Sequence, residues 1–175
     1  MNTAQFKRVV KQYKDFIYSY SYYFSGTHED AEDLTQEVLI RIWENMDSLR
    51  LGPTKSWVSK VTRNMCIDWA RRRRARPEAP VSLQSEDCEF DFPAPFEESG
   101  AEKEEMKRNI KKAIAKLPEK LKSVIILREI EDLKYEEISD VLNMPLNSVK
   151  SYIHRGRRLL REQLSAIYED EYSVK

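Results

Sequence analysis

Hydrophobic side chains in the first third of the chain recur at steps of three and four residues, which is the spacing of amphipathic helices. The pattern predicts a first helix over about 6–20, which Gly26 would end, and a second helix from the cap Thr27 to about Met46. An acid three residues after Thr27 resembles a capping box. The second helix would carry an acidic stripe, which is either a solvated face or a docking face. The stripe consists of Asp30, Asp33, Glu37, Arg41 and Glu44.

A third helix is predicted to begin at Pro53 and Thr54, because proline suits a first helical turn and threonine caps it, and to run to about Arg74. Cys66 lies between apolar positions of this helix and is interpreted as a core thiol rather than a nucleophile. One side of the helix is apolar and is expected to face the core. That side carries Trp57, Val58, Val61, Met65 and Trp69.

The other side of this third helix is basic. It carries Lys60, Arg63 and Asn64 and ends in the run 71–76, where five of six residues are arginine. Such a density of positive charge is costly unless anions neutralise it, and the phosphate backbone of a nucleic acid supplies them. Nucleic-acid binding is therefore favoured over a solvated, frayed helix end.

The second half of the chain begins with two predicted helices, one before and one after Pro118. A short helix over 135–142 follows, and the pattern breaks at 143–145. A basic helix over 148–160 comes next, with Ser148 as its expected cap. A short helix, a tight turn and a basic helix together predict a helix-turn-helix.

The basic helix has the chemistry of a DNA-recognition helix. Val149 and Ile153 are spaced to face inward, and the stretch from Met144 through Arg161 has five Lys and Arg residues but no acid. Short donors near the helix N-terminus suit base edges, and arginines suit phosphates or guanine. DNA binding is favoured over a solvated basic face. The outward side would carry Lys150, Ser151, His154, Arg155, Arg157 and Arg158.

Charge is distributed unevenly, although the chain has 30 basic and 30 acidic residues in total. Residues 1–76 have a net charge of +5, residues 77–100 of −7 and residues 101–175 of +2. The middle block has four prolines, no Lys or Arg and no sustained periodicity, which predicts an extended acidic linker between two helical domains. The linker is either a mere tether or a segment that contacts a partner.

Composition narrows the class of protein further. The 175 residues are 41% hydrophobic and 34% charged with four glycines, which favours helices over a turn-rich β-sandwich. The sequence shows no signal-peptide pattern and no apolar run of about 18 residues, so a cytoplasmic protein without membrane insertion is expected. Two cysteines, Cys66 and Cys88, form neither a disulfide framework nor a zinc site by themselves. No catalytic set appears, so we predict no enzyme activity, metal or cofactor.

Three segments resemble the bacterial extracytoplasmic-function (ECF) sigma factors, which are minimal two-domain members of the sigma-70 superfamily. The segment 30–38 resembles the region 2 helix that binds polymerase, and 57–74 resembles the helix that melts and reads the −10 element. The segment 127–138, with the later 148–151, resembles region 4. The resemblance implies an all-α protein with a region 2 domain at 1–76, an acidic linker at 77–100 and a region 4 domain at 101–170.

The resemblance also implies partners. In such proteins the acidic region 2 helix docks on the β′ clamp helices of core RNA polymerase, and region 4 binds the β flap and promoter DNA. An anti-sigma factor is implied as a further partner. The residues that would bind polymerase are Asp30, Asp33, Gln36 and Glu37, with Leu39 and Arg41 nearby.

The two promoter elements would be read by different domains. The −35 element would contact the outward side of the recognition helix. By position, its bases would face Lys150, Ser151, His154 and Arg155, and its phosphates would contact Arg157 and Arg158. The −10 element would be melted, with a flipped base held by the loop before the third helix and by that helix. The residues expected there are Leu49, Arg50, Lys60, Arg63, Asn64 and Arg71.

Two other functions remain open at this point. The first is a helix-turn-helix regulator that binds DNA without polymerase, which would bind specific DNA tightly on its own. The second is a protein–protein module, such as a decoy that binds polymerase but no promoter. Replacing Lys150 and Arg155 by Ala separates the second from a sigma factor, because a decoy would keep its activity.

Overall fold

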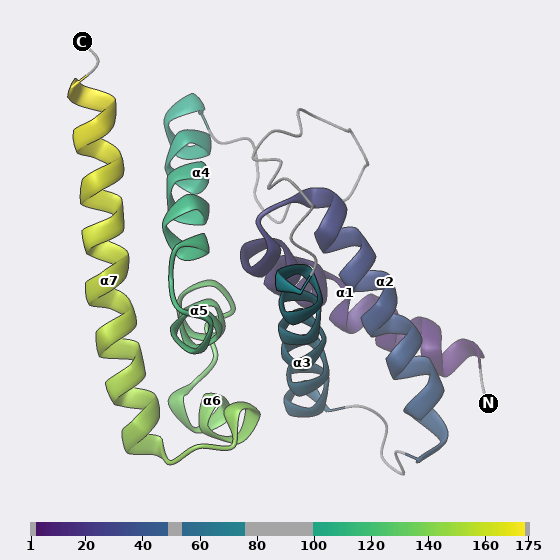
Figure 1. Ribbon diagram of the computed structural model, residues 1–175. Helices are drawn as coiled ribbons and strands as arrows, with labels where there is room; N and C mark the ends of the chain where they lie inside the picture. The colour runs from purple at the N-terminus through teal and green to yellow at the C-terminus, as the bar shows by residue number, and fades with distance from the viewer. Residues whose placement is uncertain (1–2, 49–53, 76–99, 174–175) are drawn as a thin grey trace.

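The protein is all-α in the part of the chain that the computed structural model describes, which is residues 3–48, 54–75 and 100–173, and the expected fold class is confirmed. Leu49, Arg50 and the acidic linker lie outside these residues. Figure 1 shows two groups of helices, α1–α3 and α4–α7, with the long α7 beside α4 and α5. The elements are α1 (Thr3–Ser25), α2 (His28–Asn45), the 3-10 turn η1 (Met46–Ser48), α3 (Lys55–Arg74), α4 (Ala101–Ala115), α5 (Glu119–Ile125), the π-helical turn η2 (Ile126–Ile130), α6 (Tyr135–Leu142) and α7 (Leu146–Ser173).

The end of the first helix and the starts of the next two lie at the glycine and the threonine caps that the sequence predicts. Gly26 has a φ of +92°, a left-handed conformation that glycine adopts without strain, and α1 ends immediately before it. The Thr27 side chain accepts a hydrogen bond from the N–H of Asp30, and that of Thr54 accepts one from the N–H of Trp57. The three helices pack around a buried cluster formed by Val9, Tyr13, Ile17, Val38, Ile42, Met46 and Val58.

The buried side of α3 is rotated from the predicted one. Trp57 and Trp69 are only partly buried, while the small polar residues Ser59 and Thr62 are completely buried. Each of these hydroxyls donates to a carbonyl one turn earlier, Ser59 to Lys55 at 2.8 Å and Thr62 to Val58 at 2.8 Å. With their polar atoms satisfied within the helix, these small side chains allow α3 to pack closely. The predicted apolar side does face the core, since Val58 is buried and Trp57, Val61, Met65 and Trp69 pack against buried clusters, but the most buried side also includes Ser59 and Thr62.

The helix-turn-helix is formed by α6 and α7. Asn143 ends α6 in the left-handed conformation, with a φ of +49°, and the first bond of α7 runs from the N–H of Val149 to the carbonyl of Pro145 at 3.1 Å. Because α7 begins at Leu146, Ser148 lies inside its first turn and is not the cap that we expected. The helix also continues well beyond residue 160, and its C-terminal half packs beside α4.

The two groups of helices contact each other directly. Tyr20 and Phe24 of α1 and Cys66 of α3 belong to the same buried cluster as Ile114 of α4 and Ile125 of α5. Polar contacts border this cluster: Lys111 donates to the Tyr22 hydroxyl at 3.1 Å, the ammonium of Lys122 lies 5.2 Å from the ring centroid of Phe24, and Arg74 forms an ion pair with Glu119. The surfaces of α1 and α3 are therefore covered in part by the second half of the chain.

Candidate nucleic-acid interface

The helix-turn-helix presents an exposed polar face on α7, opposite the buried side chains of Val149 and Ile153. Within the described residues, no ion pair involves Lys150 or Arg155, so both cations remain available to an external anion. The outward orientation that the sequence predicted for this face is confirmed, while its role in DNA binding stays a prediction. The face consists of Lys150, Ser151, His154 and Arg155.

Gly156 fixes the orientation of this face, because α7 passes very close to α5 at this residue. A Cβ atom at Gly156 would lie 2.6 Å from Cγ1 and 2.7 Å from Cδ1 of Ile125, a completely buried side chain. Glycine therefore allows an approach that any other residue would obstruct. The close contact sets the rotation of α7 and leaves the polar face outward.

Asn147 extends the polar face by one turn, and the sequence analysis did not include it. Asn147 is exposed in the first turn of α7, and its carbonyl accepts a hydrogen bond from the Ser151 hydroxyl at 3.0 Å. The expected start at Ser148 left this residue outside the helix. Pro145 was the signal for an earlier start, since proline is common where a helix begins.

The two arginines expected on phosphates are both paired within the chain. Arg157 is partly buried, and its Nε and Nη2 donate to Oε1 of Glu129 at 2.8 and 2.7 Å. Arg158 is exposed and lies 3.8 Å from Glu162 on the next turn. Arg157 is thus directed toward η2, whereas an exposed pair such as Arg158–Glu162 contributes little and is easily exchanged for a phosphate.

The residues that are exposed on the outward face of α2 are not the same as those expected to bind polymerase. The side chains of Asp33 and Gln36 are exposed and form no hydrogen bond or ion pair with another described residue. Arg41 is exposed and pairs with Glu44 at 3.6 Å, whereas Leu39 is partly buried and packs against the core of the first three helices. The exposed apolar residue on this face is Ile40, at 57% exposure, which the sequence analysis did not include.

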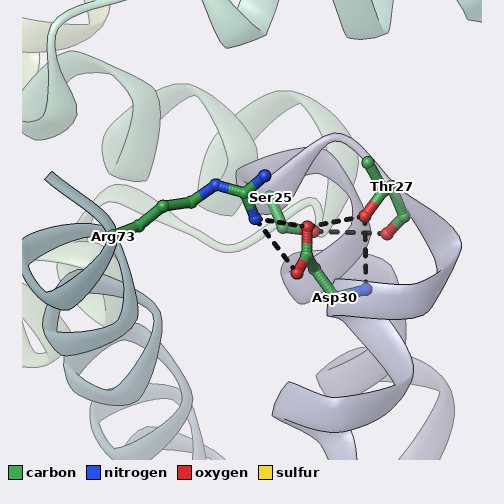
Figure 2. Close-up of polar contacts among 4 residues, drawn as sticks. All are labelled: Ser25, Thr27, Asp30 and Arg73. Atoms are coloured by element: carbon green, nitrogen blue, oxygen red, sulfur yellow. Dashed lines mark hydrogen bonds and ion pairs between the residues drawn. The ribbon is translucent and has the colours of Figure 1, made fainter. Parts of the chain in front are cut away.

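Asp30 is enclosed in a hydrogen-bond network between the start of α2 and the end of α3 (Figure 2). Nη1 of Arg73 donates to Oδ1 of Asp30 at 3.2 Å and to Oδ2 at 3.0 Å. The Thr27 hydroxyl donates to Oδ2 at 2.7 Å and accepts from the Asp30 N–H at 3.2 Å. The side chain of Asp30 is only 20% exposed, so its carboxylate is not freely presented to a partner.

The arginine run at the end of α3 is neutralised by the chain's own carboxylates. Arg71 pairs with Asp68 at 3.3 Å, one turn earlier on the same helix. Arg72 pairs with Glu37 of α2 at 3.3 Å. Arg73 pairs with Asp30, and Arg74 with Glu119 of α5. Carboxylates of the chain therefore pair with Arg71, Arg72, Arg73 and Arg74, and a phosphate would have to displace them; Arg76 lies outside the described residues.

The −10 residues expected on α3 differ in accessibility. Lys60 and Asn64 are exposed, while Arg63 is partly buried: its Nη1 donates to Oδ1 of Asn64 at 3.2 Å, and its buried Nε has no hydrogen-bond partner. A crevice of about 550 Å³ separates this part of α3 from the end of α6 and the turn that follows. The residues that line it are Ser56, Lys60, Ser139, Asp140, Asn143, Met144 and Pro145.

Two buried titratable groups lie near the contact between the two groups of helices. Burial raises the pKa of Glu131 to about 7, although a hydrogen bond from Ser19 and the charge of Lys55 oppose the rise. Burial also raises the pKa of the Cys66 thiol to about 12, which fits the core thiol expected from the sequence.

Within the described ranges, His, Cys, Asp and Glu side chains form no cluster of three that could hold a metal ion. None of the described helices is long and apolar enough to cross a membrane.

Comparison with known proteins places both halves of the chain in one family. Residues 9–76 match the model of sigma-70 region 2, and residues 107–160 match that of sigma-70 region 4. The chain is 34% identical over 167 residues to the ECF RNA polymerase sigma factor SigW of Bacillus subtilis, a match that covers 91% of this chain and 88% of SigW. It is also 34% identical to the ECF sigma factor SigE of Mycolicibacterium smegmatis, where the match covers 90% of this chain and 60% of SigE.

Solved structures show the same fold. A chain of the co-crystal structure of the sigma factor RpoE with the anti-sigma factor NepR from Bartonella quintana matches with a TM-score of 0.69 at 24% identity, covering 91% of this chain and 96% of that one. A chain of the complex between CnrH and the cytosolic domain of CnrY matches with a TM-score of 0.68 at 21% identity, covering 94% and 90%. The fold, the two matched regions and the identity to SigW agree, and the chain belongs to the ECF group of RNA polymerase sigma factors.

Proposed function

We propose that this chain binds core RNA polymerase, recognises −35 and −10 promoter elements and starts transcription of a specific set of genes. It would act in the cytoplasm, where the polymerase is. It would perform no catalysis of its own, because the phosphodiester chemistry belongs to the polymerase. An all-α chain with a DNA-recognition helix in one half and a basic helix in the other supports this division of labour.

The observation that carries the proposal is the exposed face of α7. Lys150 and Arg155, which form no ion pair with another described residue, lie beside the short donor Ser151 near the start of the helix. The contact between Gly156 and Ile125 holds the helix so that this face points away from α5. A helix with these properties fits a major groove, where short donors reach base edges and cations reach phosphates.

The exposed face of α2 is the surface that we propose for polymerase. Asp33 and Gln36 are exposed and unpaired within the described residues, and Ile40 supplies an apolar contact one turn later. A polar rim around an apolar residue is the usual anatomy of a protein–protein contact. Leu39 contributes to the core behind this surface rather than to the surface itself.

The proposed function also implies a division of the chain into two domains. We propose a region 2 domain at 1–76 and a region 4 domain at 101–170, joined by the acidic segment 77–100. Because Ser56 and Lys60 of α3 face the turn after α6 across the crevice, the two domains would have to separate before α3 could hold melted −10 DNA. Docking on polymerase would supply the free energy for this separation.

An anti-sigma factor is a further proposed partner. The structures of RpoE with NepR and of CnrH with the cytosolic domain of CnrY contain chains of this fold in complexes. A partner that binds the packed arrangement of the two domains more tightly than the separated one would shift the equilibrium toward it and would keep α3 from the −10 element.

Run-off transcription tests the proposed function. Purified chain is added to bacterial core RNA polymerase with a library of genomic fragments, and the 5′ ends of the transcripts are mapped. The expected result is a set of discrete starts that share two upstream motifs. Specific retention of DNA by the chain alone, without starts, would instead identify a regulator that works without polymerase.

A variant with Lys150→Ala and Arg155→Ala makes the assignment of the recognition face testable. We expect it to lose most starts while it keeps its affinity for core polymerase, because the substituted residues are far from α2 in the chain and exposed on α7. Lys112→Ala is the matched control, since Lys112 is exposed on α4 and belongs to neither proposed surface. Unchanged starts in the double variant would remove Lys150 and Arg155 from the recognition face, whereas polymerase binding without any starts, even by the unsubstituted chain, would favour a decoy.

A further inference from the structure

Asp30 belongs by sequence to the acidic stripe of α2, but its environment differs from that of its neighbour Asp33. Asp33 is exposed and unpaired among the described residues, while the side chain of Asp30 is 20% exposed. Oδ1 of Asp30 accepts from Arg73, and Oδ2 accepts from both Arg73 and Thr27. Both oxygens are therefore occupied, and any partner that used this carboxylate would have to break charge-assisted hydrogen bonds first.

The main chain at Asp30 is fixed as well. Its N–H donates to the Thr27 hydroxyl, and the carbonyl of Thr27 accepts from the hydroxyl of Ser25 at 3.3 Å. Figure 2 shows the carboxylate between the capped start of α2 and the guanidinium of Arg73. Asp30 is thus held on the first turn of α2 as a rigid acceptor that is directed toward the end of α3.

Arg73 is held on its other side by an aromatic ring. Its guanidinium carbon lies 5.2 Å from the ring centroid of Trp69, one turn earlier on α3, and Trp69 packs against the buried cluster shared by both halves of the chain. The Arg73 side chain is 35% exposed, whereas those of Arg71, Arg72 and Arg74 are 61–75% exposed. Arg73 is the anchored member of the run, and the other three project from the turn that it holds.

We propose that Asp30 is a positioning residue for the DNA-binding end of α3, which acts through Arg73, and that it is not part of the surface that docks on polymerase. The proposal rests on the proposed function and assigns a different role to one residue of its expected polymerase-binding set. Asp30 fixes the last turn of α3 against α2, and Arg71, Arg72 and Arg74 then meet the DNA backbone from a defined direction. Such preorganisation lowers the conformational cost of binding.

The test compares Asp30 with Asp33, which lie three residues apart on α2. Asp30→Asn and Asp33→Asn remove the same charge, and two quantities are measured for each variant: its affinity for core polymerase, and the affinity of the assembled holoenzyme for a promoter at saturating polymerase. For Asp30→Asn we expect an unchanged polymerase affinity and a promoter affinity lower by about tenfold, the size of one lost charge-assisted contact. For Asp33→Asn we expect a lower affinity for core polymerase and an unchanged affinity of the assembled holoenzyme for the promoter.

Two further variants separate positioning from a loss of stability. Thr27→Ala removes the cap of α2 but leaves the pair between Asp30 and Arg73, so it should lower the melting temperature without lowering promoter affinity in holoenzyme. In the double variant Asp30→Asn with Arg73→Gln, promoter affinity should equal that of Arg73→Gln alone, because Asp30 acts only through Arg73. The dependence of promoter affinity on salt should become shallower in Asp30→Asn, as fewer arginines reach phosphates.

The possible outcomes are distinct. A fall in polymerase affinity for Asp30→Asn equal to that for Asp33→Asn would place Asp30 in the docking surface and overturn the proposal. Equal promoter affinity in Asp30→Asn and the unsubstituted protein would also overturn it, as would a loss in Thr27→Ala as large as that in Asp30→Asn. A failure of the proposed function looks different, since no variant, and not even the unsubstituted chain, would then direct transcription starts.

Discussion

A Cβ atom at Gly156 on α7 would lie only 2.6 Å from Cγ1 of Ile125 on α5, closer than two such carbon atoms approach in folded proteins. Because Ile125 is completely buried, it has no free space into which it could move. This pair therefore fixes the distance and rotation of the recognition helix relative to the rest of the second half of the chain.

Gly156→Ala is expected to destabilise the protein by about 1–3 kcal/mol, the usual cost of an extra methyl group in a packed contact. It should also lower promoter affinity, because α7 would shift away from α5. Urea unfolding and holoenzyme binding measure the two effects. Gly100→Ala is the matched control, since a Cβ there meets nothing within 4 Å. Equal stability of both variants would contradict the close contact.

The stability of the protein should depend on the protonation of Glu131. Burial raises the pKa of this carboxyl to about 7, above its value in the unfolded chain, so the folded state binds a proton more tightly. The resulting stabilisation is complete at low pH, and it is lost as the pH rises through about 7. Between pH 5 and 8 the free energy of unfolding should therefore fall by up to about 3 kcal/mol.

Urea unfolding at several pH values measures this dependence. Glu131→Gln should flatten it and should be the more stable protein above pH 7, because the amide remains neutral. The groups that interact electrostatically with Glu131 are Lys55, Tyr20 and Tyr23, and burial raises the pKa of both tyrosines above its ordinary value. Glu136→Gln, an exposed change on α6, should retain the dependence of the unsubstituted protein. A flat profile in the unsubstituted protein would refute the prediction.

Arg155 and Arg157 are two residues apart but should contribute differently to DNA binding. Arg155 is exposed and unpaired within the described residues, while Arg157 donates twice to Glu129. Arg155→Ala should reduce the slope of log affinity against log salt by about 0.9, the value for one phosphate contact. Arg157→Ala should leave the slope nearly unchanged and should instead lower the melting temperature. Titrations of holoenzyme with a −35 element at several salt concentrations decide between them, and equal slopes would contradict the prediction.

Ile40 and Leu39 are adjacent on α2, but substitution of Ile40 should weaken polymerase binding, whereas substitution of Leu39 should lower stability. Ile40 is 57% exposed, so Ile40→Ser should change the free energy of unfolding by less than about 0.5 kcal/mol while it weakens binding to core polymerase. Leu39 packs against the core, so Leu39→Ala should cost about 1–2 kcal/mol of stability. Thermal unfolding and a polymerase titration of both variants suffice. Full polymerase affinity in Ile40→Ser would remove this residue from the proposed surface.

Much of the architecture is encoded in short stretches of sequence. The apolar spacing predicted the helices, and Thr27 and Thr54 marked the starts of α2 and α3 correctly, because caps depend on a hydrogen bond to an N–H three residues away. The helix-turn-helix was predicted from a short helix, a break in the pattern and a basic helix in succession. The outward face of α7 was predicted from the spacing of apolar residues along that one helix. The structure differs from the sequence pattern at two places: α7 begins before Ser148, at Leu146, and the buried side of α3 also includes Ser59 and Thr62, whose hydroxyls donate to carbonyls of their own helix.

The helices, the order of the two regions and the residue types on each face thus follow from local sequence patterns. Which charges are free depends on how the helices pack, because ion pairs such as Asp30–Arg73, Glu37–Arg72 and Glu129–Arg157 join residues 28 to 43 positions apart. Helical periodicity gives the direction of a side chain from its own helix axis. It contains no information on how close another helix lies, and that distance decides whether a carboxylate is offered to a partner or already holds an arginine of its own chain.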